Sequence, residues 1–429
     1  MNCTNKDLNI LDVKAKILDV NESNINYCAK KLKEGKLVSF STETVYGLGA
    51  NCFDKEAVLN IFKFKGRPLS DPLILHVYSI DQIYPLVEID NNTKELLEDI
   101  AAIFWPGPLT VILKANKSKI SNYITADTDY VSFRIPNHKD ALELLRKVDF
   151  PIAAPSANKF CHVSPVSAYH VYDDFKEYDI KILNSGYCEF SMESSVIKPL
   201  LNEKVILIYR KGALTELDFK KFFNSYDLKY IDFKVEYFNK TRDINTDNSF
   251  VHEKDVLIDR INLIKGPTIF KDENIGLEED DTTSSKEAPG QFNKHYSPLI
   301  STYICKFNKM TSKLSNNKLI KCIDLTSEVA KNAVIIDYNK SIINYIDTIK
   351  KEKLVIDYKP LEYYDLSPNN ISFDAQKNLY KYLREAEKVK NAQLILVPDF
   401  ENILDKENPY KSTLVDRVEK ASSFNILYL

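Results

Sequence analysis

Residues 41–77, STETVYGLGANCFDKEAVLNIFKFKGRPLSDPLILHV, join two turns of different chemistry through a short amphipathic segment. The first turn is rich in hydroxyl groups and glycine, and the second, Lys65-Gly66-Arg67-Pro68, places two cations ahead of a proline. Hydroxyl groups beside exposed backbone amides suit a small polar ligand, whereas a Lys-x-Arg pair suits phosphate. The stretch therefore predicts two turns that together hold an anionic, nucleotide-like substrate next to a smaller molecule.

Apolar periodicity and capping residues predict alternating helices and strands around this stretch. We expect helices over 24–34 with Asn24 as the cap, from Asp54 to a stop at Gly66, over 93–104, over 140–148, and from a Ser164-Pro165 start to about 175. Strands are expected at 36–40, 73–77, 109–113, 131–135, 182–183, 195–197 and 205–209, and residues 151–158 are expected to form a strand that runs into a turn of small residues. This alternation favours an α/β fold with a twisted, partly parallel sheet.

The second half of the chain divides into a linker and a smaller α/β domain. Charge rises and apolar periodicity fades over 215–290, although 217–223 can form a helix, and 288–298 is aromatic and rich in turn residues. We expect strands at 302–306, 319–324, 333–337, 353–356 and 394–398, and helices over 374–389 and 412–422. The predicted domains are 21–214, a linker over 215–298, and 299–429.

Composition narrows the class of protein. The 429 residues are 44% hydrophobic and 28% charged, which is ordinary for a soluble globular protein, and contain no apolar run of about 18 residues. The net charge of −3 argues against a protein that mainly neutralises a nucleic-acid backbone. Seven scattered cysteines without a Cys-x-x-Cys pair fit reduced thiols, and the N-terminus resembles neither a secretion signal nor a typical transit peptide. We expect a cytoplasmic protein without a structural metal.

Several polar residues allow both a structural and a functional interpretation. Lys65 and Arg67 could be solvated charges or an anion site, and Pro68 favours the latter because it restrains Arg67. His76 interrupts an apolar strand, where a satisfied core histidine is the commoner case. Arg134 also lies in a strand and needs a carboxylate partner, from the protein or from a ligand. No Ser-His-Asp or Cys-His arrangement stands out, so an enzyme of this sequence would act by positioning and charge stabilisation.

Taken together, several runs of sequence resemble the YrdC/Sua5 family. These runs are STETVYGLGA, KGRPLSDPLILHV, FWPGPLTVIL, VSFRIPNH, PIAAPSANKF, SPVSAYHV, ESSVI and YRKGALT, within residues 21–214. The family's Lys-x-Arg and Ser-x-Asn signature corresponds to Lys65, Arg67, Ser156 and Asn158. PGQFNKHYSP resembles the linker of the long Sua5 form, and DAQKNLYKYLREAEKVKNAQLILV resembles its C-terminal domain. The resemblance implies a YrdC-like mixed sheet followed by a smaller Rossmann-like Sua5 C-terminal domain.

The resemblance also implies a reaction, the synthesis of threonylcarbamoyl-AMP. L-threonine takes up bicarbonate or CO2 on its amine, the carbamate attacks the α-phosphorus of ATP, and pyrophosphate leaves, with Mg²⁺ accompanying ATP. A partner transferase would then place the group on the adenosine at tRNA position 37, giving N6-threonylcarbamoyladenosine, and transient contact with tRNA is possible. The implied threonine-binding residues are Thr44, His76, Arg134 and Ser194. The implied ATP-binding residues are Lys65, Arg67, Asp71, Tyr130, Ala154, Ser156, Asn158, Ser164, Arg210 and Tyr296, with Lys65 and Arg67 catalytic and Tyr296 closing over the nucleotide.

Two departures and two alternatives accompany this interpretation. Many relatives have Asn where Asp71 stands, and a carboxylate beside phosphates needs a cation. The linker is also longer than is common.

The main alternative is a non-catalytic module that binds RNA through the same basic concave site and would show a steep salt dependence of RNA binding. Carbamoyl transfer to another acceptor, as in larger hydrogenase-maturation proteins with a YrdC-like domain, is a further alternative, although their extra domains have no counterpart here.

Overall fold

The computed structural model describes residues 14–225, 229–230, 232–238, 286–289, 295–307, 328–353 and 358–429. Packing divides the chain into two compact units, Met1–Ser194 and Ser195–Leu429. The domain boundaries proposed from the sequence stay predictions.

The first unit is built on a mixed sheet. Its strands follow the order β1-β8-β2-β3-β7-β4-β6-β5. Neighbours are parallel in the β1–β8, β8–β2 and β4–β6 pairs and antiparallel in the others. The bounds are β1 Lys16–Asp19, β2 Val38–Phe40, β3 Gly47–Asn51, β4 Ile74–His76, β5 Leu109–Lys114, β6 Tyr130–Arg134, β7 Ile152–Ala153 and β8 Lys181–Asn184. The predicted α/β class with a partly parallel sheet is confirmed.

Helices connect these strands, and α2 begins and ends as its sequence predicts. The helices are α1 Glu22–Lys33, α2 Lys55–Lys65, α3 Asn91–Phe104, α4 Asn122–Thr125, α5 Lys139–Lys147 and α6 Ala168–Phe175. Asp54 caps α2 by accepting a hydrogen bond from the amide of Ala57, at 3.0 Å. Gly66 ends it with a left-handed φ of 67°, a conformation in which glycine is favoured.

Two predicted helix starts are wrong. Helix α1 is capped by Asn21 and not by Asn24, whose side chain instead donates to the carbonyl of Asp19. Helix α6 begins at Ala168 with Ser167 as its cap, and not at Ser164-Pro165. The carbonyl of Pro165 accepts a hydrogen bond from the amide of Tyr46, at 2.9 Å, so this segment is held by a distant turn before the helix can begin.

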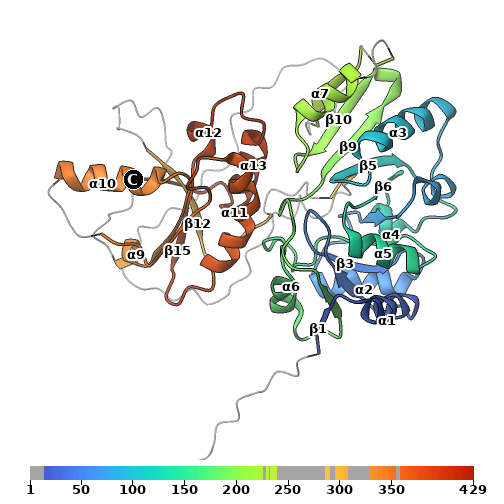
Figure 1. Cartoon of the computed structure of the whole chain (residues 1–429), viewed down its shortest axis with the longest axis horizontal. Coiled ribbons are helices and arrows are strands. Elements are labelled where there is room, and N and C mark those ends of the chain that lie inside the picture. Colours follow the sequence, from blue (N-terminus) through green and yellow to red (C-terminus); the bar gives the residue numbers. More distant parts are fainter. Residues whose placement is uncertain are drawn as a thin grey trace, which may run out of the picture. The chain divides into compact units, whose positions relative to one another are not determined.

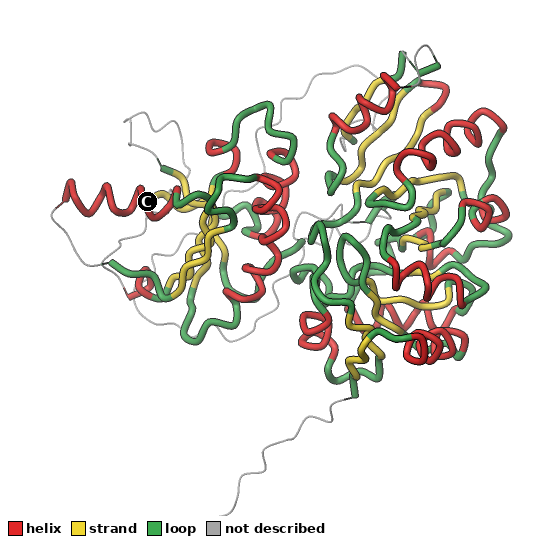
Figure 2. The backbone as a smooth tube through the Cα atoms, in the orientation of Figure 1, coloured by secondary structure: helices red, strands yellow, loops and turns green. Residues whose placement is uncertain are grey.

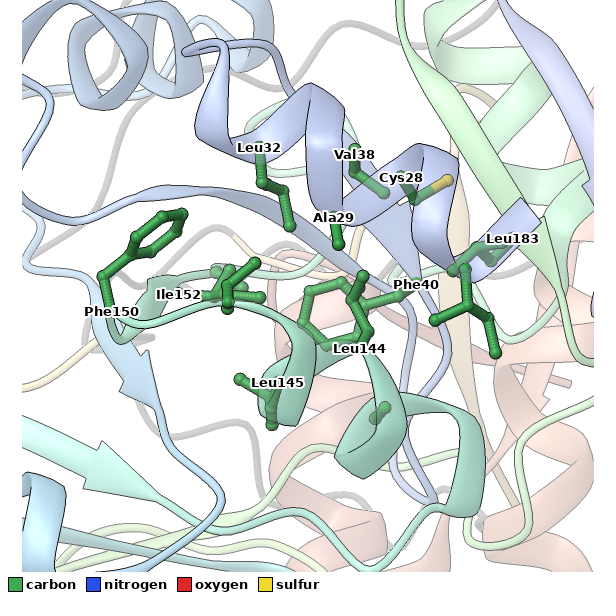
Figure 3. Close-up of a cluster of buried hydrophobic side chains, with 14 residues drawn as sticks. Cys28, Ala29, Leu32, Val38, Phe40, Leu144, Leu145, Phe150, Ile152 and Leu183 are labelled. Atoms are coloured by element: carbon green, nitrogen blue, oxygen red, sulfur yellow. The ribbon is translucent and has the colours of Figure 1, made fainter. Parts of the chain in front are cut away.

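Helices α1 and α5 pack on the sheet around one apolar cluster (Figure 3). Its members include Cys28, Ala29, Leu32, Val38, Phe40, Leu144, Leu145, Phe150, Ile152 and Leu183. Phe40 also lies edge-on to the ring of His76, with the ring centroids 6.1 Å apart. The core therefore extends to one of the residues implied in threonine binding.

The second unit contains two sets of strands. Strand β10 (Val205–Arg210) pairs antiparallel with β9 (Ser195–Leu200) and parallel with β11 (Lys234–Tyr237), and helix α7 spans Glu216–Ser225. The other set is an all-parallel sheet in the order β14-β13-β15-β12-β16. Its strands are β12 Thr302–Lys306, β13 Ala333–Asp337, β14 Glu362–Asp365, β15 Leu394–Pro398 and β16 Ile426–Tyr428.

Helices cover both faces of the parallel sheet, with α10 on one side and α11 and α13 on the other (Figures 1 and 2). The helices are α9 Glu328–Lys331, α10 Ser341–Lys353, α11 Ser372–Ala386, α12 Phe400–Ile403 and α13 Lys411–Ala421. The smaller Rossmann-like α/β domain is thus confirmed. The strand predicted at 353–356 is wrong at Lys353, which ends α10, and its remainder and the strand predicted at 319–324 lie outside the described residues. Among the helices that the structure describes, none has the length and apolar character to cross a membrane.

Candidate functional site

The second turn of the 41–77 stretch buries its arginine. Arg67 donates from Nε to the carbonyl of Asp71 at 3.1 Å and from Nη2 to the carbonyl of Pro72 at 2.7 Å. Its Nη2 also lies 2.9 Å from Oδ2 of Asp71, and both side chains are buried. The guanidinium of Arg67 is therefore fixed by protein partners and is not a solvated surface charge. The pairing also accounts for a carboxylate at position 71, because Arg67 offsets its charge.

Lys65 joins this turn to the Ser156–Asn158 segment. Its Nζ donates to the carbonyls of Ser156 and Asn158, both at 2.6 Å. Burial, followed by the nearby charge of Arg67, lowers the pKa of Lys65 well below its usual value. The side chain of Asn158 donates in turn to the carbonyl of His162, at 2.8 Å. The structure thus brings the two halves of the signature together.

The first turn also contacts this segment. Gly47 forms an isolated antiparallel bridge with Ser156, and a Cβ atom on Gly47 would lie 3.3 Å from the Cβ of Ala154. A side chain at position 47 would thus be in tight contact, and Ala154 would have to shift by a few tenths of an ångström to admit it. Within the turn, the hydroxyl groups of Thr42 and Thr44 lie 2.8 Å apart. Both turns of the opening stretch therefore converge on residues 154–158.

His76 and Arg134 are partners in adjacent parallel strands, β4 and β6. Burial, with the charge of Arg134 as a second cause, lowers the pKa of His76 to about 3, so its imidazole is neutral at physiological pH. Arg134 donates from Nε to the carbonyl of Gly107 at 3.2 Å, and its Nη2 lies 2.7 Å from Oε1 of Glu43. Arg134 thus has a protein carboxylate as partner, and the implied clamp on a substrate carboxylate stays a prediction.

Two buried acidic residues were missed by sequence reasoning. Glu43 is 1% exposed and pairs with Arg134, and the hydroxyl of buried Ser164 donates to Oε1 of Glu193 at 2.5 Å. Next to Glu193, the hydroxyl of Ser194 lies 2.7 Å from that of Thr110. The one available signal for Glu43 was a lone charge inside a turn otherwise made of hydroxyl groups, glycine and apolar residues.

The remaining implied site residues occupy other places. Tyr130 begins β6 and is partly buried. Arg210 ends β10 in the second unit. Tyr296, also in that unit, is fully buried, with the guanidinium of Arg417 4.6 Å from its ring centroid and the ring of Tyr380 stacked at 5.6 Å. The participation of these three residues in one site stays a prediction. Within the described ranges, no group of three or more His, Cys, Asp or Glu side chains is arranged to hold a metal ion.

Comparisons with known proteins identify the family of this chain. The Sua5/YciO/YrdC family model, described as telomere recombination, matches residues 30–212, and a model described as the C-terminal domain of threonylcarbamoyl-AMP synthase matches 258–423. A threonylcarbamoyl-AMP synthase of Hydrogenovibrio crunogenus is 34% identical over 136 residues, which are 31% of this chain and 72% of that protein. The chain belongs to the Sua5/YciO/YrdC family.

The second family model and one solved structure support the two-domain form, whereas longer curated relatives match over about half of their length. A threonylcarbamoyl-AMP synthase of Pyrococcus abyssi is 43% identical over 195 residues, which are 46% of this chain and 56% of that protein. One of Schizosaccharomyces pombe is 41% identical over 198 residues, or 42% of this chain and 48% of that protein. The chain thus spans about half the length of these curated relatives. The crystal structure of P. abyssi Sua5 complexed with L-threonine matches with a TM-score of 0.67 and 26% identity, covering 97% of this chain and 99% of that one.

The buried neutral His76 makes stability depend on pH. Its folded-state pKa of about 3 lies below the ordinary value of 6.5, so below about pH 6.5 the unfolded chain takes up a proton that the folded chain does not. We expect the contribution of neutral His76 to the free energy of unfolding to be complete above pH 6.5 and to be lost progressively toward pH 3. At pH 5 the loss is about 2 kcal/mol. Urea unfolding of the wild type and of His76→Gln at about pH 7 and 5 tests this, since the variant lacks the contribution; equal pH dependence in the two proteins would contradict it.

Proposed function

We propose that the chain is an L-threonylcarbamoyladenylate synthase, making threonylcarbamoyl-AMP and pyrophosphate from L-threonine, bicarbonate or CO2, and ATP. The observation that carries the proposal is the convergence of both turns on residues 154–158. Lys65 bonds the carbonyls of Ser156 and Asn158, and Gly47 bridges Ser156. The turn proposed to bind phosphate and the turn proposed to bind the amino acid both contact this segment, which supports a reaction between an amino acid and a nucleotide.

The threonine half of the site would use neutral and charged groups in separate roles. Arg134 would hold the carboxylate, because a guanidinium forms paired hydrogen bonds with a carboxylate. His76, neutral at physiological pH, could exchange a hydrogen bond with the threonine hydroxyl without adding a second charge beside Arg134. Thr44 and Ser194 would complete the polar contacts from the first turn and from the end of the first unit.

The ATP half would rely on charge held in place before the substrate arrives. Lys65 and Arg67 would face the phosphates, where negative charge grows as the carbamate oxygen attacks the α-phosphorus and pyrophosphate leaves. The other proposed ATP contacts are Asp71, Tyr130, Ala154, Ser156, Asn158, Ser164, Arg210 and Tyr296. Mg²⁺ would enter with ATP and offset charge on the phosphates. Asp71 is already paired with Arg67, so its carboxylate would sit beside phosphates with its charge offset.

The product is a reactive mixed anhydride, so it would pass to a transferase that modifies tRNA at position 37. We propose a cytoplasmic setting for this pathway. Five cysteines in the described ranges, Cys28, Cys52, Cys161, Cys188 and Cys305, are free thiols, which suits a reducing compartment.

The deciding experiment is incubation of the full chain with ATP, bicarbonate and labelled L-threonine. We expect pyrophosphate release that depends on threonine and a product that contains both the label and AMP. Omission of threonine and replacement by D-threonine are the controls. Absence of threonine-dependent pyrophosphate, together with tight and strongly salt-dependent binding of tRNA, would favour a non-catalytic RNA-binding module instead.

A further inference from the structure

Glu43 and Arg134 place two opposite charges side by side in the interior of the first unit. Oε1 of Glu43 lies 2.7 Å from Nη2 of Arg134, and the two side chains are 1% and 4% exposed. Neither carboxylate oxygen of Glu43 has a hydrogen-bond partner among the residues that the structure describes. The contact with Arg134 is therefore an ion pair without a hydrogen bond. A buried carboxylate with so few partners is costly, since burial without hydrogen bonds removes its hydration.

The surroundings of Glu43 leave its charge to be balanced mainly by Arg134. The backbone carbonyl of Glu43 accepts a hydrogen bond from the amide of Phe190, at 2.8 Å, so the backbone of this turn is held. His138 and Cys188 lie near enough to feel the charge of Glu43, and burial is the first cause of the shift at each, lowering the pKa of His138 and raising that of the Cys188 thiol to about 12. Neither group is a cation at physiological pH. A positively charged hydrogen-bond donor of a ligand would therefore be stabilised by the carboxylate of Glu43.

An α-amino acid carries the matching pair of charges. Its ammonium and carboxylate groups are attached to one carbon and are separated by only two bonds. A site that recognises both groups needs an anion next to a cation, which is the arrangement of Glu43 and Arg134. When the substrate carboxylate engages Arg134, the substrate ammonium would supply Glu43 with hydrogen-bond donors.

We propose that Glu43 binds the α-ammonium group of the amino-acid substrate and thereby makes the site selective for α-amino acids over α-hydroxy acids. This inference rests on the proposed function, because it requires that Arg134 holds the substrate carboxylate. It assigns to Glu43 a role that a purely structural ion pair would not have. A structural pair would support Arg134 equally well whichever acid was bound.

The test compares L-threonine with the analogue in which a hydroxyl group replaces the α-amino group. Binding of each to the full-length wild type is measured by calorimetry. A hydrogen bond to a buried charged group contributes about 10- to 100-fold in affinity, so we expect the analogue to bind more weakly by about that factor. If the wild type binds both molecules equally well, the inference is overturned while the proposed function survives. If it binds neither, the proposed function fails and this inference fails with it.

The Glu43→Gln variant sharpens the comparison. We expect its affinity for L-threonine to fall by about 10- to 100-fold, its preference over the hydroxy analogue to disappear, and its affinity for ATP to be unchanged. Glu193→Gln is the matched control, because Glu193 is also buried in the first unit but accepts from Ser164; its preference for the amino acid should persist. Retained preference in Glu43→Gln would overturn the inference. If that variant does not fold, the wild-type comparison and Glu43→Asp, which keeps the charge and should keep the preference, still decide.

Discussion

Replacing Arg67 with methionine is expected to lower both the stability and the activity of the protein. Asp71 is fully buried and pairs with Arg67 at 2.9 Å, so the variant would leave a buried carboxylate without its cation. Removing one member of such a pair typically costs about 3–5 kcal/mol of unfolding free energy. Loss of the charge stabilisation proposed for Arg67 should lower turnover by about 100- to 1,000-fold. Urea unfolding and the assay of threonine-dependent pyrophosphate measure the two effects.

The double variant Arg67→Met with Asp71→Leu separates these effects. Removing both charges should restore the part of the stability that the unpaired carboxylate of Asp71 costs, because an apolar pair of similar volume can replace a buried ion pair at little cost. The part lost with the hydrogen bonds of Arg67 to the carbonyls of Asp71 and Pro72 should not return. Activity should remain as low as in the single variant, since the proposed contact of Arg67 with phosphate is still missing. Recovery of activity together with stability would show that Arg67 acts only through folding and would contradict its assignment to ATP.

Replacing Lys65 with methionine is the second change with a large expected effect. The variant would leave the carbonyls of Ser156 and Asn158 without the donor that now lies 2.6 Å from each. Each buried carbonyl left unsatisfied costs about 1–3 kcal/mol. The segment that both turns contact would loosen and the phosphates would lose a cation, so we expect activity to fall by at least about 100-fold.

Lys159 offers a matched control for this variant. Its Nζ donates to the carbonyl of Phe64 at 2.7 Å and lies 2.9 Å from the hydroxyl of Tyr178, so it joins the end of α2 to the chain that follows Asn158. Lys159→Met should lose stability but keep nearly wild-type activity. An equal loss of activity in both variants would attribute the effect of Lys65 to the connection between these segments and not to its charge near ATP.

Helix ends were predicted best where the signal, a capping residue or a glycine stop, lies within a few residues of the end. Asp54 and Gly66 bound α2 as expected, because a cap and a left-handed stop depend on atoms of the same helix. The start of α6 was wrong because the Ser164-Pro165 segment is engaged elsewhere, by Glu193 and by the amide of Tyr46. Helix α10 was not anticipated. Its first turn is satisfied by Asp337, at the end of β13, which accepts hydrogen bonds from the amides of Ile342 and Ile343.

The sequence by itself determined the α/β class, the two-domain form and the family, whereas the binding roles of the two turns in residues 41–77 stay predictions. These conclusions depend on residue types and short spacings. Only the tertiary structure decided that Lys65 bonds the Ser156–Asn158 segment and that Arg134 pairs with Glu43. The partners in these contacts are far apart in the chain, and the order and register of the sheet bring them together. A buried charge must find a partner wherever the fold places one, so a partner that is distant in the chain, as Glu43 is from Arg134, cannot be identified from local sequence.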